Sequence, residues 1–340
     1  MTIRTTSRRS QVNKQHLYCI LGIILAIVAC RKSDDWVDIS PFMGFQKARN
    51  FPEPVYNFAT NKITEAGFNL GKKLFYEPLL SRNNTISCGS CHISYYAFTH
   101  HGHTVSHGIE DKEGIRNALP IMNLAWNESF FWDGGVHNLD LSSVAPIENP
   151  VEMDEKLSNI VLKLQKNKEY PGLFKAAFGT EGISSERMLK ALSQFMLLLI
   201  SDQSKYDKVQ RGEGGMLFTA EEQAGYLLFK KHCNTCHSEP LFTDQSFRDI
   251  GLGLNPAKDY GRYDITLHER DKLKFKVPSL RNLKYTAPYM HDGSYLTLAA
   301  VMQQFQSGSI KLNNEETTQI LAFLETLNDA QFTLDKRFAE

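Results

Sequence analysis

The chain has 340 residues, of which 42% are hydrophobic, and its 38 Lys and Arg balance its 38 Asp and Glu. Without the first 29 residues, which carry four basic and no acidic residues, 311 remain with 34 basic against 38 acidic, a net charge of −4. A mildly acidic chain without basic blocks excludes nucleic acid as an expected partner. This length suits two medium domains, each able to bury its own core.

The first 29 residues have the pattern of an export signal. Basic residues come first, and a run of thirteen apolar residues follows from Leu17 to Ala29. Such a run is too short to span a bilayer comfortably but suits the apolar part of a secretory signal. The stretch IVAC, which ends at Cys30, resembles the lipobox of bacterial lipoproteins. We therefore expect a periplasmic protein that is lipidated at Cys30 and held on a membrane; the alternative is an uncleaved N-terminal anchor.

Helical periodicity dominates the chain after a proline-containing segment over 30–60, which we expect to be a linker. Thr219 with Glu222 and Asn313 with Glu316 form capping boxes that predict two helix starts. Alternating strands are scarce, so the predicted class is mostly α. Apolar residues share one helical face in three further segments: Ile63, Ala66, Leu70 and Leu74; Leu157, Ile160, Val161 and Leu164; and Met188, Leu192, Phe195, Met196 and Leu199.

An internal repeat divides the chain. The stretch GKKLF over 71–75 precedes one C-x-x-C-H motif, and GYLLF over 225–229 precedes a second. A glycine- and charge-rich segment over 205–215 separates the two copies. We therefore predict an N-terminal domain over 61–205 and a C-terminal domain over 216–335, each laid out as a c-type cytochrome domain.

C-x-x-C-H is the attachment signature of c-type haem. Two thiols on one helical turn can reach the two vinyl groups of a porphyrin, and the adjacent imidazole then becomes the proximal iron ligand. Paired cysteines also serve zinc ribbons and thioredoxin-like sites, but zinc leaves the histidines unexplained and no βαβ pattern is present. Two covalent haems are therefore expected, haem 1 on Cys88, Cys91 and His92, and haem 2 on Cys233, Cys236 and His237.

More histidines follow the first motif than one haem needs. Most lone histidines are surface or core residues, so spacing alone does not choose which of them reaches the far side of haem 1. The candidates are His100, His101, His103 and His107.

The motifs as a set resemble the bacterial di-haem cytochrome c peroxidases and the superfamily that they share with the di-haem enzyme maturing tryptophan tryptophylquinone. The resemblance runs from about Asn61 to Leu327, through LGKKLFYEPLLS, SCGSCH, FFWDGG, PIENPVEM, CNTCH, FKVPSLRN and TAPYMHDG. It implies hydrogen peroxide as substrate and a small exported c-type cytochrome or copper protein as electron donor. Family members are often dimers, so it also implies a homodimer.

The resemblance also implies roles for single residues. The H-G dipeptide in TVSHG implies that His107 is a removable distal ligand of haem 1 and that the other three histidines are surface or loop residues. The NPVEM stretch implies that Glu152 moves a proton between the peroxide oxygens; the alternative is an exposed Glu near the start of a helix over 153–168. Trp132 matches the tryptophan between the two haems. Asn117, Thr286 and Pro288 match calcium-binding positions, with backbone carbonyls assumed for the last two.

Two positions depart from the family pattern. Ser142 stands where the peroxidases carry a glutamine. Phe305, fourteen residues after His291, stands where haem 2 takes its sixth ligand, methionine in the peroxidases and tyrosine in the quinone-maturing enzyme. Met302, one turn earlier, is the candidate replacement; Met290 and a five-coordinate iron are the alternatives.

These observations lead to one hypothesis and two alternatives. The leading hypothesis is a cytochrome c peroxidase that reduces hydrogen peroxide to water. One alternative is an oxidase of the quinone-maturing type acting on a protein or organic substrate, and the other is a non-enzymatic di-haem electron carrier. Methionine ligation raises the potential of a haem, so the absence of methionine at 305 weakens the first hypothesis.

Overall fold

A computed structural model describes residues 42–308 and 310–340. The predicted signal segment, Cys30 and the first part of the predicted linker lie outside the described residues. Residues Met43–Glu340 form one compact unit. No helix within 42–308 or 310–340 is long and apolar enough to cross a membrane.

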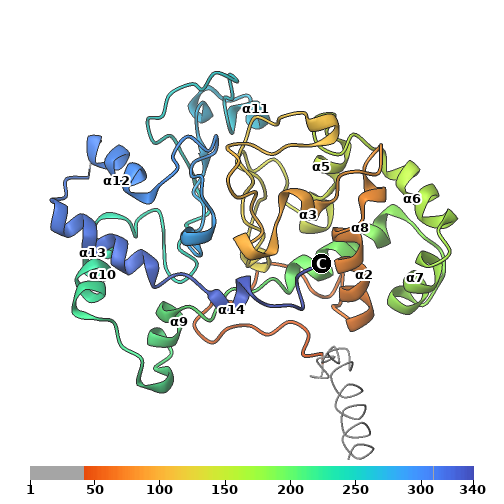
Figure 1. Cartoon of the computed structure of the whole chain (residues 1–340), viewed down its shortest axis with the longest axis horizontal. Coiled ribbons are helices and arrows are strands. Elements are labelled where there is room, and N and C mark those ends of the chain that lie inside the picture. Colours follow the sequence, from red (N-terminus) through yellow and green to blue (C-terminus); the bar gives the residue numbers. More distant parts are fainter. Residues whose placement is uncertain (1–41, 309) are drawn as a thin grey trace, which may run out of the picture. The chain divides into compact units, whose positions relative to one another are not determined.

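The described chain is mostly helical, which confirms the predicted class (Figure 1). Its one sheet pairs β1 (Phe247–Arg248) with β2 (Phe275–Lys276) in antiparallel register, Phe247 opposite Lys276. The α-helices are α2 (Glu65–Phe75), α3 (Cys88–Cys91), α4 (Leu139–Ser142), α5 (Val144–Glu148), α6 (Leu157–Lys166), α7 (Tyr170–Phe178), α8 (Ser185–Leu197), α9 (Lys205–Gln210), α10 (Ala220–His232), α11 (Tyr263–Thr266), α12 (Leu298–Ser307), α13 (Asn314–Glu325) and α14 (Ala330–Thr333). Short 3-10 turns are η1 (Pro78–Leu80), η2 (Ser94–Tyr96), η3 (Ile109–Asp111), η4 (Leu124–Trp126), η5 (Glu213–Gly215), η6 (Glu269–Asp271) and η7 (Leu283–Tyr285).

The repeated glycine of the sequence has the same structural reason in both copies. Helix α2 packs against α8, and α10 packs against α13. A Cβ atom at Gly71 would overlap the backbone carbonyl of Ala191, and a Cβ at Gly225 would overlap that of Gln319. Only glycine allows backbones to approach this closely. The two helix pairs, drawn on opposite sides of Figure 1, are therefore built by the same contact.

Both predicted capping boxes are present. The Thr219 side chain accepts a hydrogen bond from the Glu222 amide, and Glu222 accepts one in return from the Thr219 amide at 2.7 Å. Asn313 and Glu316 exchange the same two bonds, each at 2.9 Å. These reciprocal bonds satisfy amides at the starts of α10 and α13 that have no partner within the helix.

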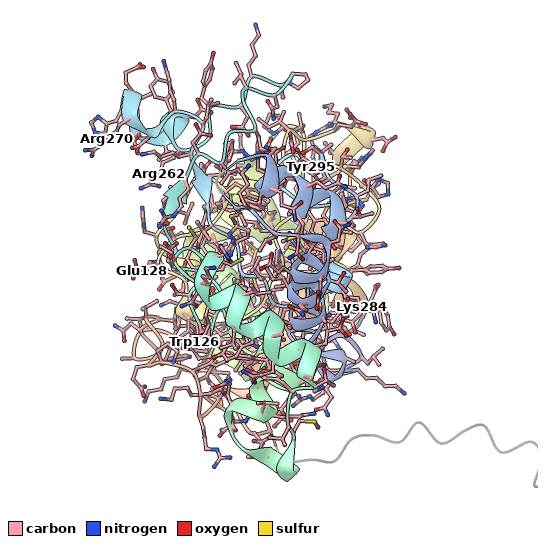
Figure 2. All side chains as sticks on the ribbon, turned by 90° about the vertical axis from the view of Figure 1, so that its left-hand side faces the viewer. Trp126, Glu128, Arg262, Arg270, Lys284 and Tyr295 are labelled. Carbon is pink, nitrogen blue, oxygen red and sulfur yellow. The ribbon has the colours of Figure 1, made fainter. Side chains whose placement is uncertain are left out.

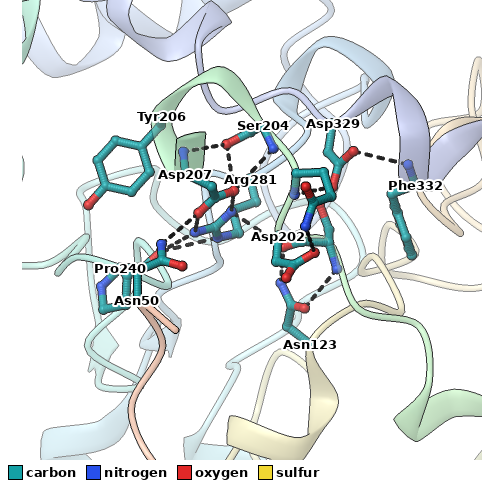
Figure 3. Close-up of polar contacts among 12 residues, drawn as sticks. Asn50, Asn123, Asp202, Ser204, Tyr206, Asp207, Pro240, Arg281, Asp329 and Phe332 are labelled. Atoms are coloured by element: carbon teal, nitrogen blue, oxygen red, sulfur yellow. Dashed lines mark hydrogen bonds and ion pairs between the residues drawn. The ribbon is translucent and has the colours of Figure 1, made fainter. Parts of the chain in front are cut away.

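A buried ion pair joins segments that are far apart in sequence (Figure 3). The Arg281 guanidinium, 0% exposed, donates to both carboxylate oxygens of Asp207 at 2.8 Å. Asp207 also accepts from Ser204 and from Asn50 at 2.7 and 2.9 Å. Burial alone would raise the pKa of Asp207, but the guanidinium and these donors outweigh burial and hold that pKa below its ordinary value.

The predicted boundary over 205–215 and the described part of the predicted linker both contain ordered, packed residues. Residues 205–215, expected as the boundary between repeats, contain helix α9, which begins after Ser204 with a capping box to Asp207. The described part of the first linker is packed rather than loose: the Trp126 indole donates to the Pro52 carbonyl at 2.8 Å. The Arg281 guanidinium lies over the ring of Phe51, with its Cζ atom 4.6 Å from the centre of that ring.

Candidate haem and peroxide site

Two cavities surround the two C-x-x-C-H motifs. The larger, about 740 Å³, is lined by Cys88, Cys91 and His92. The smaller, about 220 Å³, is lined by the corresponding residues of the second motif, Cys233, Cys236 and His237. The structure therefore brings each predicted attachment motif to the wall of its own cavity.

The first motif is one turn of helix. Helix α3 begins after Ser87, whose side chain forms a capping box with Ser90. Neither Cys88 nor Cys91 forms a disulfide. The Nδ1 atom of His92 lies 2.6 Å from the Phe98 carbonyl, so Nδ1 carries the proton and Nε2 is left available as a ligand. Burial lowers the pKa of His92, which favours the neutral form that binds metals.

The second motif is a turn at the end of α10. The Cys233 amide donates to the Phe229 carbonyl at 2.8 Å, and the His237 amide donates to the Cys233 carbonyl at 2.9 Å. The Nδ1 atom of His237 lies 3.1 Å from the carbonyls of both Phe242 and Pro278. Burial also lowers the pKa of His237. Free thiol pairs, oriented neutral imidazoles and adjoining cavities together fit a covalently attached haem at each motif.

Glu152 lines the larger cavity beside the first motif. Its side chain is mostly buried, and burial raises its pKa. The Asn149 side chain donates to Glu152 Oε1 at 2.7 Å. Sequence reasoning missed Asn149, although its position three residues before the carboxylate was visible.

The alternative interpretation of Glu152 is wrong. Helix α6 begins at Leu157 rather than near 153, so Glu152 is not in its first turn. The amides of Glu152 and Asp154 both donate to the Asn149 carbonyl, which holds this stretch in a turn. Asp154 adopts a positive φ of 50°, which ends the turn before the helix can begin.

His107 does not line either cavity, whereas its neighbours Ser106 and Gly108 line the larger one. Its Nδ1 lies 3.0 Å from the Asp111 carboxylate. Its ring centre lies 4.8 Å from that of His103 and 6.0 Å from that of His100. His101 lies apart from these three and stacks on Tyr96, with 4.2 Å between ring centres.

Trp132 lines both cavities. The side chain is 8% exposed, and its Nε1 donates to the Asn117 carbonyl at 2.9 Å. The indole therefore forms part of the wall that the two cavities share.

The predicted residues for the far side of haem 2 all line the smaller cavity. Met302, Phe305 and Met290 are among its lining residues. Met302 belongs to the apolar cluster that also contains Phe229 and Phe323. Met302 is therefore both a cavity residue and a core residue.

Comparisons with known proteins agree with these motifs. A family model for di-haem cytochrome c peroxidases matches residues 65–215. Cytochrome c551 peroxidase of Nitrosomonas europaea is 36% identical over 272 residues, covering 77% of this chain and 80% of that protein. The methylamine utilization protein MauG of Methylophilus methylotrophus is 32% identical over 336 residues, covering 92% of this chain and 95% of that protein. The chain belongs to the di-haem cytochrome c peroxidase family. It is accordingly a peroxidase-type oxidoreductase, and its family implies two c-type haems.

A solved structure is also similar. It is described as a MauG-like protein associated with microbial copper homeostasis, is 32% identical and superposes with a TM-score of 0.80. The similarity covers 86% of this chain and 98% of that one. The two chains therefore share one fold over nearly the whole length of the MauG-like protein.

The departures from the family pattern can be located in the structure. Ser142 lines the larger cavity, and its hydroxyl donates to the Leu139 carbonyl at 2.8 Å within α4.

The three residues predicted to bind calcium all line the smaller cavity: Asn117, Thr286 and Pro288. The side-chain nitrogen of Asn117, Nδ2, donates to the carbonyls of His103 and Thr104, which leaves the side-chain oxygen for another partner. In the part of the chain that the structure describes, no group of three or more His, Cys, Asp or Glu side chains is arranged to hold a metal ion.

Proposed function

We propose that this chain reduces hydrogen peroxide to water with electrons from a small exported donor, a c-type cytochrome or a copper protein. The observation that carries the proposal is Glu152, a partly exposed carboxyl group with a raised pKa in the wall of the cavity of the first attachment motif. A proton-transfer group beside a haem site is what peroxide reduction needs and what simple electron transfer does not need.

When attached, the haems would supply the redox chemistry: the site at the first motif would serve peroxide reduction, and the site at the second would serve electron storage. The protein holds them through the thiols of the two motifs and the Nε2 atoms of His92 and His237. The carbonyl of Phe98 fixes the orientation of His92. The division into a peroxidatic haem domain over 61–205 and an electron-transfer haem domain over 216–335 is part of this proposal.

Glu152 acts as the acid–base group. Its carboxylate would accept the proton of one peroxide oxygen and return it to the other, so that water can leave. The raised pKa suits both steps, because a carboxylate of higher pKa takes up a proton more readily than an ordinary Glu and can still release it. The hydrogen bond from Asn149 holds the carboxyl group in place.

His107 is proposed as the removable distal ligand of haem 1. Its neighbours line the larger cavity while its own ring faces Asp111, His103 and His100. In this proposal the ring exchanges between a position at haem 1 and the position beside Asp111. The hydrogen bond to Asp111 then stabilises the position outside the cavity, which leaves room for peroxide.

Trp132 is proposed to carry electrons between the two haem sites, because its indole forms part of both cavity walls. Met302 is proposed as the sixth ligand of haem 2, from its place in the wall of the smaller cavity. A calcium ion bound by the Asn117 side chain and the carbonyls of Thr286 and Pro288 would need further oxygens from water, which is usual for this ion. Periplasmic placement, a lipid on Cys30 and a homodimer complete the proposal.

The experiment compares Glu152→Gln with Glu148→Gln. Both changes replace a carboxylate by an amide of equal size, but Glu148 is exposed at the end of α5. Peroxide turnover with a reduced c-type cytochrome should fall about 10²–10⁴-fold in Glu152→Gln and stay unchanged in Glu148→Gln. Haem content should be equal in all three proteins. Full turnover by Glu152→Gln with both haems attached would overturn the proposal.

A second candidate is peroxide-dependent oxidation of another protein, favoured by two observations. The chain is 32% identical to a relative named MauG over nearly its whole length. In addition, Ser142 and Phe305 replace two residues of the peroxidase pattern. Mass spectrometry of periplasmic proteins incubated with the holoprotein and peroxide tests this candidate. An oxidised tryptophan or tyrosine that requires both components would support it, and an unmodified sample would exclude it.

A further inference from the structure

Three cationic side chains line the two cavities: Arg116, Arg248 and Lys276. Both arginines are already paired with carboxylates. Arg116 Nε lies 2.6 Å from Asp259, and Arg248 Nη2 lies 2.7 Å from Asp244. These two cations therefore have their charge compensated within the protein.

Lys276 differs from both arginines. Its side chain is 6% exposed, and it lines both cavities. Within residues 42–308 and 310–340, its ammonium group forms no ion pair; the exposed Glu128, labelled in Figure 2, attracts it only beyond ion-pair distance. Burial lowers the pKa of Lys276 to about 8. An ammonium group without an ion-pair partner therefore lies in the wall that the two cavities share.

The protein satisfies only part of the hydrogen-bonding capacity of the Lys276 ammonium group. The ammonium group donates to the Ser129 carbonyl, and the backbone amide of Lys276 donates to the Trp132 carbonyl at 2.7 Å. An ammonium group has three donors, so a single carbonyl leaves two of them without a protein partner. A buried charge is costly unless it is paired and hydrogen-bonded. An anion in one of the adjoining cavities would supply both the opposite charge and the missing hydrogen-bond acceptors.

We propose that Lys276 binds a propionate carboxylate of a haem attached at one of the two motifs. This inference rests on the two-haem assignment of the proposed function. Each haem carries two propionates, the only carboxylates that such a cofactor brings into a cavity whose other cations are already paired. Lys276 is then a cofactor-binding residue that also places a positive charge beside the haems.

That charge has an electrochemical consequence. A nearby cation stabilises the reduced haem, which carries one positive charge fewer than the oxidised form, and so raises its midpoint potential. Removing the cation leaves a propionate unpaired and lowers the potential. The haem whose potential moves is the one that Lys276 contacts.

The test uses the holoprotein and three variants: Lys276→Gln, Lys276→Arg and Lys284→Gln. Lys284 is an exposed control whose side chain points outward in Figure 2. Anaerobic spectroelectrochemical titration should show a lower midpoint potential for at least one haem in Lys276→Gln, and wild-type values in Lys276→Arg and Lys284→Gln. Wild-type potentials in a Lys276→Gln protein that carries both haems would overturn the proposal.

A second measurement decides the matter if Lys276→Gln does not accumulate. Resonance Raman spectra of the Lys276→Arg holoprotein should show a shifted propionate bending mode, because a planar guanidinium donates in a different geometry from an ammonium group. Identical propionate modes in wild type and Lys276→Arg would overturn the proposal. Peroxide turnover of the wild type is measured separately, so a haem-loaded protein without turnover refutes the proposed function and leaves this test intact.

Discussion

Replacing Asp207 by Asn isolates the contribution of the buried ion pair to stability. The change preserves side-chain volume, so it creates no cavity, but it leaves the Arg281 guanidinium buried without a counter-ion. Breaking a buried pair by removing one partner costs about 3–5 kcal/mol. At roughly 2–4 °C per kcal/mol for a somewhat shorter chain, the unfolding midpoint of the holoprotein should fall by on the order of 10 °C.

The assay is thermal and urea denaturation followed by circular dichroism. Glu186→Gln is the control, because it removes one partner of an exposed pair with Lys190 and should leave the midpoint unchanged. The double change Asp207→Asn with Arg281→Met should cost less than the sum of the single changes, since it leaves no buried charge unpaired. A loss below about 1 kcal/mol in Asp207→Asn would refute this reasoning. Such a result would mean that the Pro240 and Ser201 carbonyls, which also accept from Arg281, compensate the guanidinium.

Three further predictions follow from the site and the fold. Gly225→Ala should destabilise the holoprotein by about 1–3 kcal/mol in urea denaturation, because a Cβ there overlaps the Gln319 carbonyl; Gly172→Ala, where nothing lies within 4 Å of the new Cβ, is the control, and equal effects would contradict the packing argument. Met302→Leu should lower the potential of haem 2 in spectroelectrochemical titration by removing the proposed methionine ligand, and an unchanged potential would show that Met302 does not bind the iron. Since burial raises the pKa of Glu152, the fraction ionised falls earlier as pH decreases, so turnover should decline at a pH above the ordinary range of Glu, about 4.3; a decline that persists in the residual turnover of Glu152→Gln would assign it to another group.

Local features were predictable from the sequence because their causes are local. The capping boxes at Thr219 and Asn313 depend on residues three apart, and the apolar faces of α6 and α8 follow from helical periodicity. The C-x-x-C-H motifs predicted which side chains share a cavity wall for the same reason. The repeated glycine was visible in sequence, but its cause, a carbonyl of another helix, was not.

Features that depend on long-range contacts could not be predicted. Asp207 and Arg281 are 74 residues apart, and nothing in the segment over 205–215 indicated that it would bury a carboxylate and form α9. The helix over 153–168 that the alternative interpretation of Glu152 assumed starts too early, because the turn held by the Asn149 carbonyl comes first. The position of Lys276 between two cavities depends on strand pairing and on the Ser129 carbonyl, 147 residues away.

The most direct test of the peroxidase account is an anaerobic titration of the haem-loaded wild type. The protein is reduced by one electron and mixed with one equivalent of hydrogen peroxide while the visible spectrum and residual peroxide are recorded. The account predicts rapid consumption of the peroxide together with loss of the absorption bands of the reduced haem. An unchanged spectrum with the peroxide still present would contradict the account and leave a di-haem electron carrier.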